Sequence, residues 1–194
     1  MKKPLALLCV FLVVACGTGA GHNSGGGELI GVGLPKTQPD PLEKRTIVFL
    51  QPESGERLNV AYFHDGRYDA AALRKINYLF RDRRAGVVGE IDPELIDFMV
   101  DIRTRLDLPT SVTFDILSGY RTPESNILLA RHNSNVAIES LHTRGWAVDF
   151  RIAGVDGRAI AAVAKTMQRG AAVFYPNSNH VHVDIGNIRT WHER

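Results

Sequence analysis

Two short segments near the C-terminal end alternate strictly between apolar and polar side chains, and they constrain the fold more than any other feature of the sequence. In residues 146–152 the apolar positions are Trp146, Val148, Phe150 and Ile152, with Asp149 between them. In residues 180–185 the apolar positions are Val181, Val183 and Ile185, and the polar ones are His180, His182 and Asp184. Because successive side chains of a strand point to opposite faces, each segment is predicted to be a strand with one face in the core.

The polar faces of these two strands suggest a metal site. If the strands are neighbours, Asp149 and His182 face one another across the sheet. His142 lies three residues before Gly145, so it can fold back from the preceding loop. Two imidazoles and a carboxylate that leave a fourth position for water are typical of catalytic zinc. The sequence therefore predicts zinc ligation by His142, Asp149 and His182, without the helical H-E-x-x-H pattern.

Other strands are predicted from short β-rich segments. Ser54-Gly55 is a turn signal between two of them, and residues 176–179 are a turn before the last strand. We expect strands over residues 46–50, 58–63, 113–117 and 171–175.

Helices are predicted where apolar residues recur at helical spacing after a capping residue. Asp92 followed by Pro93 marks one start, and Thr122-Pro123-Glu124 marks another. We predict helices over residues 70–83 and 156–169, the second of which stops at Gly170. Two further helices are predicted to begin at residues 93 and 123. Strands and helices in this order predict an α+β domain with an antiparallel sheet and flanking helices.

The first fifteen residues are typical of an export signal. Lys2 and Lys3 precede an apolar run over residues 5–15, which is shorter than the roughly 20 residues of a membrane span. We therefore expect residues 1–15 to be a signal peptide. The run ends in Val13-Val14-Ala15-Cys16, which resembles a lipobox whose cysteine is acylated after cleavage. An ordinary cleaved signal that happens to contain a cysteine is the alternative.

The two cysteines, Cys9 and Cys16, both lie in this leader. One cysteine remains after cleavage, which excludes an intramolecular disulfide and favours lipid attachment at Cys16 to a membrane. Residues 17–27 are glycine-rich, so residues 16–44 are predicted to be the lipidated cysteine and a flexible tether. Residues 45–194 would form the domain that carries the predicted zinc site. A formal net charge of +2 gives no support to a nucleic-acid partner.

Three ordered blocks carry a resemblance to a known superfamily. Residues 140–149 match S-x-H-x-x-G-x-A-x-D, preceded by Ser-Gly-Tyr-Arg at 118–121 and followed by His-Val-His-Val-Asp at 180–184. The chain resembles the D-Ala-D-Ala carboxypeptidase and murein endopeptidase superfamily of zinc peptidases from about residue 46 to 191, and most of all the murein endopeptidase K-like proteins. The resemblance implies a hedgehog/D-Ala-D-Ala-peptidase-like fold.

The resemblance also implies roles for individual residues. It makes His142, Asp149 and His182 the zinc ligands, and Arg121 a side chain that stabilises charge on the scissile carbonyl. Ser140 would lie beside the metal and form a hydrogen bond with the substrate or with a residue that contacts a zinc ligand. Arg121 as a salt-bridge partner near a helix start, and Ser140 as a loop cap, are the alternatives.

The chain departs from the superfamily pattern at the position of the general base. Relatives often carry an acidic residue three positions before the last histidine, where this chain has Asn179. The neighbouring His180 is on the same predicted strand face as His182, so we assign the role of catalytic base to His180. The alternative is that His180 is itself a ligand.

These features predict a zinc-dependent peptidoglycan hydrolase of the bacterial cell envelope. It would be a periplasmic, lipid-anchored murein DD-endopeptidase or carboxypeptidase that acts on peptide cross-links such as D-alanyl to diaminopimelyl. One alternative is a metal-containing cell-wall-binding module without turnover, which the missing acidic base favours. Another is a peptidase for a different small D-amino-acid peptide.

Overall fold

The computed structural model describes residues 39–133 and 136–189. The predicted signal peptide, the Cys16 lipid anchor and all but the end of the tether lie outside these residues. Within the described ranges, none of the helices has the length and the apolar character that crossing a membrane requires.

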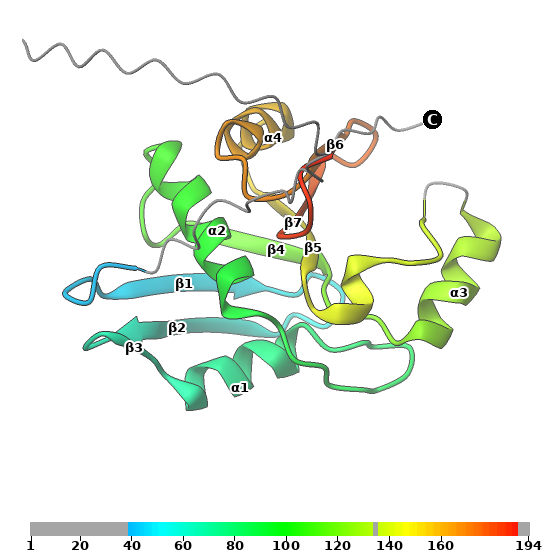
Figure 1. The fold of residues 1–194 in the computed structure, drawn as a ribbon, viewed down its shortest axis with the longest axis horizontal. Helices are drawn as coiled ribbons and strands as arrows, with labels where there is room; N and C mark the ends of the chain where they lie inside the picture. The colour runs from blue at the N-terminus through cyan, green and yellow to red at the C-terminus, as the bar shows by residue number, and fades with distance from the viewer. Residues whose placement is uncertain (1–38, 134–135, 190–194) are drawn as a thin grey trace, which may run out of the picture. The chain divides into compact units, whose positions relative to one another are not determined.

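A seven-stranded sheet in the order β3-β2-β1-β4-β5-β7-β6 forms the centre of the domain (Figure 1). The strands are β1 (Arg45–Leu50), β2 (Arg57–His64), β3 (Arg67–Tyr68), β4 (Thr113–Ser118), β5 (Ala147–Ile152), β6 (Ala172–Tyr175) and β7 (His180–Asp184). Together with the helices they confirm the α+β class. The sheet is mixed, however, because β1 and β4 pair in parallel whereas the other neighbours are antiparallel. A parallel pair needs a long crossover, which β2, β3 and two helices supply.

Among the described residues, four α-helices and one 3-10 turn connect the strands. They are α1 (Ala70–Leu79), α2 (Pro93–Arg105), α3 (Pro123–His132), η1 (Leu141–Arg144) and α4 (Gly157–Thr166). As predicted, Asp92 caps α2 and Thr122 caps α3 with side-chain oxygens. The helix predicted over residues 70–83 ends earlier, because Asp82 and Val87 pair their backbones in an isolated bridge. Similarly α4 ends before residue 169, since Gln168 adopts a left-handed backbone conformation (φ 51°).

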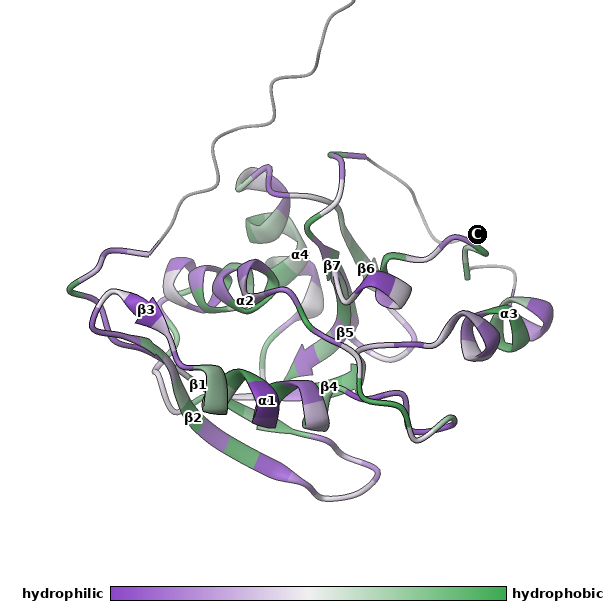
Figure 2. Cartoon of the chain, turned by 60° about the horizontal axis from the view of Figure 1, so that its bottom comes forward, coloured by the Kyte–Doolittle hydropathy of each residue, from purple (hydrophilic) through white to green (hydrophobic). Residues whose placement is uncertain are grey.

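The alternating strands bury their apolar faces as expected. Val148 and Phe150 of β5, and Val181 and Val183 of β7, are fully buried (all 0% exposed). Figure 2 shows the same alternation along β2 as successive hydrophilic and hydrophobic bands. Phe150 also packs against Phe114 of β4 with ring centroids 5.3 Å apart. The core therefore holds β4, β5 and β7 in one fixed arrangement.

A glycine lets the chain turn from η1 into β5. Gly145 has φ of 69° and its carbonyl accepts a hydrogen bond from Asp92 N at the start of α2 (3.1 Å). A Cβ at this position would lie 1.8 Å from the carbonyl oxygen of Glu90. The close approach fixes the turn that carries His142 against the loop before α2, and it excludes any side chain at position 145.

We predict that Gly145→Ala destabilises the protein far more than Gly55→Ala. Both glycines have left-handed φ, but a Cβ at Gly55 would meet no atom within 4 Å. The Gly55 variant should lose about 1–2 kcal/mol of unfolding free energy from backbone strain, and the Gly145 variant about 2–5 kcal/mol because overpacking is added. Urea unfolding followed by circular dichroism measures both. Equal losses would contradict the role of the close approach.

Candidate metal centre

The antiparallel pairing of β5 and β7 places a carboxylate beside an imidazole. Asp149 is the register partner of His182. His182 Nδ1 lies 2.8 Å from Asp149 Oδ1. The two predicted strands are therefore neighbours, and their polar side chains meet on the face opposite the core.

His142 reaches the same point from η1. Its Nε2 lies 3.3 Å from His182 Nδ1 and 3.4 Å from Asp149 Oδ1. The three ligand atoms lie within 4.8 Å of one another, and the side chains are 2%, 10% and 14% exposed for His142, His182 and Asp149. Two imidazole nitrogens and a carboxylate oxygen that converge in a mostly buried pocket could hold a metal ion. The structure thus brings together the three residues named from the sequence.

The outward nitrogens of both imidazoles have acceptors. His142 Nδ1 lies 2.7 Å from the carbonyl oxygen of Gly119, and His182 Nε2 lies 3.2 Å from Asp184 Oδ2. A neutral imidazole that donates from one nitrogen accepts at the other. In the neutral form of each ring, which is the form that binds a metal, these contacts would direct the lone pairs of His142 Nε2 and His182 Nδ1 toward the common centre.

Asp184 is a buried carboxylate behind this group. It is 0% exposed, and its Oδ2 also accepts from Arg189 Nη2 (2.6 Å). Its Oδ1 accepts from the backbone nitrogens of Ala171 and Gly186. From the sequence, Asp184 is expected to orient a histidine or to pair with an arginine rather than to bind the metal, and both contacts are present. Its position two residues after His182 on one strand was the available signal, since such residues share a face.

Arg121 contacts the outer oxygen of Asp149. Its Nη2 donates to Asp149 Oδ2 (2.7 Å), and its Nε donates to Ser118 Oγ (2.8 Å). Arg121 is therefore a salt-bridge partner, and this contact orients the Asp149 carboxylate. Ser140 caps η1, with its Oγ accepting from the backbone nitrogen of His142 (3.4 Å). Both residues border the metal centre.

The electrostatic environment keeps the carboxylate ionised. Burial would raise the pKa of Asp149, but His142 and His182 hold it well below its ordinary value. Burial lowers the pKa of His142 against the influence of Asp149. Burial would also lower the pKa of His182, but hydrogen bonds to Asp149 and Asp184 raise it to about 9. Asp149 is therefore in its metal-binding form at neutral pH.

His180 is not part of the converging group. Its ring stacks on Tyr175 with centroids 4.4 Å apart and planes 6° apart, and its Nδ1 lies 2.6 Å from Ser178 Oγ. Asn179, at the position of the relatives' acid, has a left-handed backbone (φ 50°). Its side chain accepts from Gly157 N and donates to the Val155 carbonyl. Asn179 therefore fixes the turn before β7.

Comparison with known proteins gives one consistent match. Residues 40–191 match the family Peptidase_M15_2, described as peptidoglycan L,D-endopeptidase MepK. The chain is 36% identical over 147 residues to the probable peptidoglycan L,D-endopeptidase MepK of Haemophilus influenzae, covering 76% of this chain and 78% of that protein. It is 36% identical over 138 residues to the peptidoglycan L,D-endopeptidase MepK of Escherichia coli K12, covering 71% and 75%. No solved structure gives a significant match.

We predict that His142→Ala and His182→Ala each lose tight metal binding, whereas His180→Ala keeps it. Removing one of three ligands leaves an incomplete site, but His180 stands outside the converging group. Metal content after dialysis, measured by inductively coupled plasma mass spectrometry, distinguishes the three variants. Loss of metal from His180→Ala would make His180 a ligand.

We predict that Asp184→Asn weakens metal affinity by roughly 10–100-fold, since it alters the carboxylate that orients His182. The matched control is Asp115→Asn. Asp115 is a carboxylate of the neighbouring β4 that pairs with Arg151 (3.2 Å) and lies outside the group. A competition titration against a chromophoric chelator gives both affinities. Equal affinities for the two variants would exclude an orienting role for Asp184.

Proposed function

We propose that this chain, which belongs to the MepK family of peptidoglycan L,D-endopeptidases, is a zinc-dependent hydrolase that cleaves L,D peptide bonds in cell-wall cross-links. The convergence of His142, Asp149 and His182 is the observation that carries the proposal. The relatives' names specify an L,D bond, whereas the prediction from the sequence was a DD-endopeptidase or carboxypeptidase, with the D-alanyl to diaminopimelyl link as an example. We therefore propose the L,D bond in place of the D,D bond.

Zinc suits the donor set of this centre. Two imidazoles and one carboxylate form an open three-ligand site, in which zinc supplies a Lewis acid that lowers the pKa of coordinated water to about 7. His142, Asp149 and His182 would hold the ion. Gly119 and Asp184 would keep the two imidazoles in the required orientation.

We assign Arg121 the role of stabilising negative charge on the oxygen of the scissile carbonyl. Ser118 and Asp149 fix its Nε and Nη2. None of the described residues accepts a hydrogen bond from its Nη1. A guanidinium held at two positions can direct its remaining donor at the carbonyl oxygen, where negative charge develops as water adds to the carbon.

His180 is the residue that we assign to proton transfer. The ring is held by Tyr175 and Ser178, and a Nδ1–H that donates to Ser178 Oγ leaves Nε2 as the basic nitrogen. It lies two residues before His182 on β7, about 7 Å away by Cα spacing. His180 Nε2 would take a proton from the attacking water. It would return that proton to the leaving amine as the carbon–nitrogen bond breaks and the carbonyl becomes a carboxylic acid.

The envelope location and the anchor complete the proposal. A peptidoglycan substrate requires export, for which residues 1–15 would serve as the signal peptide. Acylation of Cys16 would tie the enzyme to a membrane, and the glycine-rich residues 17–27 would let the domain reach a fixed polymer.

We predict that zinc-loaded protein converts L,D-cross-linked muropeptides to two monomers whose summed mass exceeds that of the dimer by one water. His142→Ala should be inactive. His180→Ala should keep its metal but lose about 10²–10⁴ in kcat, the usual contribution of a general base. His64→Ala, a change at a partly exposed histidine of β2, is the control. Liquid chromatography with mass spectrometry identifies the products.

The same assay separates hydrolysis from simple binding. Retention on purified cell-wall sacculi without any product would favour the non-catalytic wall-binding module. Full activity of His180→Ala would show that proton transfer uses another group.

A further inference from the structure

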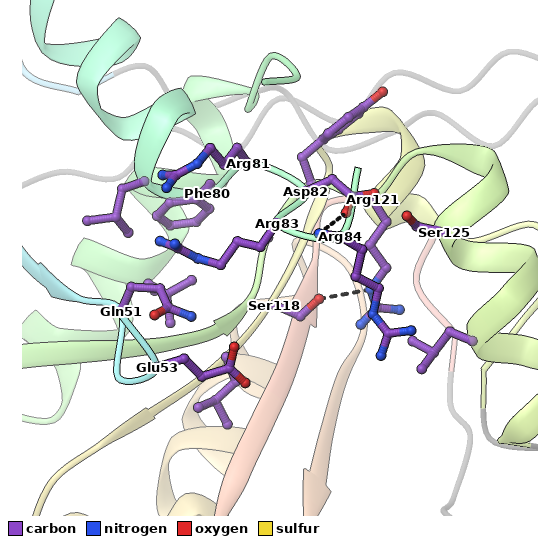
Figure 3. A pocket seen from close by; sticks show the side chains of 16 residues that line it. Gln51, Glu53, Phe80, Arg81, Asp82, Arg83, Arg84, Ser118, Arg121 and Ser125 are labelled. Carbon is purple, nitrogen blue, oxygen red and sulfur yellow. Dashed lines mark hydrogen bonds between the residues drawn. The ribbon is translucent and has the colours of Figure 1, made fainter. Parts of the chain in front are cut away.

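A pocket of about 250 Å³ lies beside the metal centre and shares Ser118 and Arg121 with it (Figure 3). The turn after α1, residues 81–84, forms another part of its wall. The volume is below the roughly 300–1,000 Å³ of pockets that enclose a whole small-molecule ligand. The pocket is therefore sized for one part of a larger substrate whose reacting bond lies at the neighbouring centre.

Asp82 holds the two walls of this pocket together. Its buried carboxylate (4% exposed) accepts from the backbone nitrogen and the hydroxyl of Thr122, at 2.8 and 3.0 Å. It also accepts from the backbone nitrogens of Arg84 and Ala85. Thr122 directly follows Arg121, so one carboxylate fixes the backbone of Arg84 relative to that of Arg121. This is a preorganised arrangement of two arginines that lie far apart in the sequence.

The arginines of the pocket differ in how their charges are compensated. Arg81 and Arg83 both form ion pairs with Glu56. The Arg84 side chain is exposed and forms no hydrogen bond or ion pair with any residue in the described ranges. Figure 3 draws Arg84 with Arg121 at the end of the pocket toward Ser125, whereas the acidic Glu53 lies at the end toward Gln51. The pocket that Arg121 lines therefore also offers the guanidinium of Arg84, which no acidic residue in the described ranges compensates.

We propose that Arg84 binds a free carboxylate of the substrate peptide next to the scissile amide. The inference rests on the proposed L,D-endopeptidase function. In an L,D cross-link between two diamino acids, the scissile nitrogen is attached to a carbon atom of D configuration. The same carbon carries a free carboxylate, so the carboxylate carbon lies two bonds from the scissile nitrogen. Arginine presents a planar fork that matches a carboxylate with two parallel hydrogen bonds. With Arg121 at the carbonyl, Arg84 recognises the amine side of the bond and selects diamino acids with a free carboxylate.

The test compares two synthetic L,D-cross-linked peptides that differ at this carboxyl group, one a free acid and the other a carboxamide. The zinc-loaded full chain should cleave the acid with a KM about tenfold or more below that of the carboxamide, as expected for a charged hydrogen bond. Arg84→Gln should reduce the preference to less than about threefold, through a higher KM for the acid and an unchanged kcat. Arg84→Lys should keep part of the preference.

Arg74→Gln is the matched control, since Arg74 is an exposed arginine of α1 outside the pocket. It should retain the full preference for the acid. Unchanged preference in Arg84→Gln, or no preference in the wild-type chain, would overturn the proposal. If wild-type chain cleaves neither peptide, the proposed function fails. Binding of the amine-side fragment, as acid or amide, then decides the inference by isothermal titration calorimetry with wild-type and Arg84→Gln protein.

Discussion

The antiparallel register between β5 and β7 is the constraint on which the site depends, because it sets Asp149 directly opposite His182. A slip of one residue would turn every side chain of a strand to the other face. Val148 and Phe150 would leave the core, and each such side chain contributes about 1.5–3 kcal/mol through burial. The free energy that forms the core therefore also fixes Asp149 and His182 beside one another in the candidate metal site. No separate device is needed to keep these two groups together.

The charged groups buried at this centre need partners of opposite charge. The surrounding residues supply these partners, so that positive and negative side chains alternate outward from the centre. Outward from the centre, Asp149 meets the cation Arg121, and His182 meets the anion Asp184, which in turn pairs with Arg189. An unpaired buried charge costs several kcal/mol, whereas a paired and hydrogen-bonded one is tolerated. The outer residues thus serve stability and ligand orientation at once, since the same contacts perform both functions.

The features that could be predicted from the sequence are those that follow from local patterns. Alternation gave the strand faces of Asp149 and His182, and capping residues gave the starts of α2 and α3. The parallel pairing of β1 with β4 could not be predicted, because it depends on how a long crossover packs. The strand spacing also predicted that Asp184 orients a histidine or pairs with an arginine. Which arginine and which backbone nitrogens it contacts could not be predicted, because those contacts come from the tertiary fold.

The early end of α1 shows why tertiary contacts matter for function here. Helical periodicity alone extends this helix to residue 83, but the chain leaves the helix after Leu79. The Asp82–Val87 bridge and the bonds from Thr122 to Asp82 stabilise the alternative turn more than one further helical turn would. That turn places Arg84 in a pocket wall beside the metal centre, where a continued helix would hold it elsewhere. The residues that depart from the helical pattern therefore include the arginine to which we assign substrate binding, and local inconsistency of this kind is expected where a fold serves a ligand.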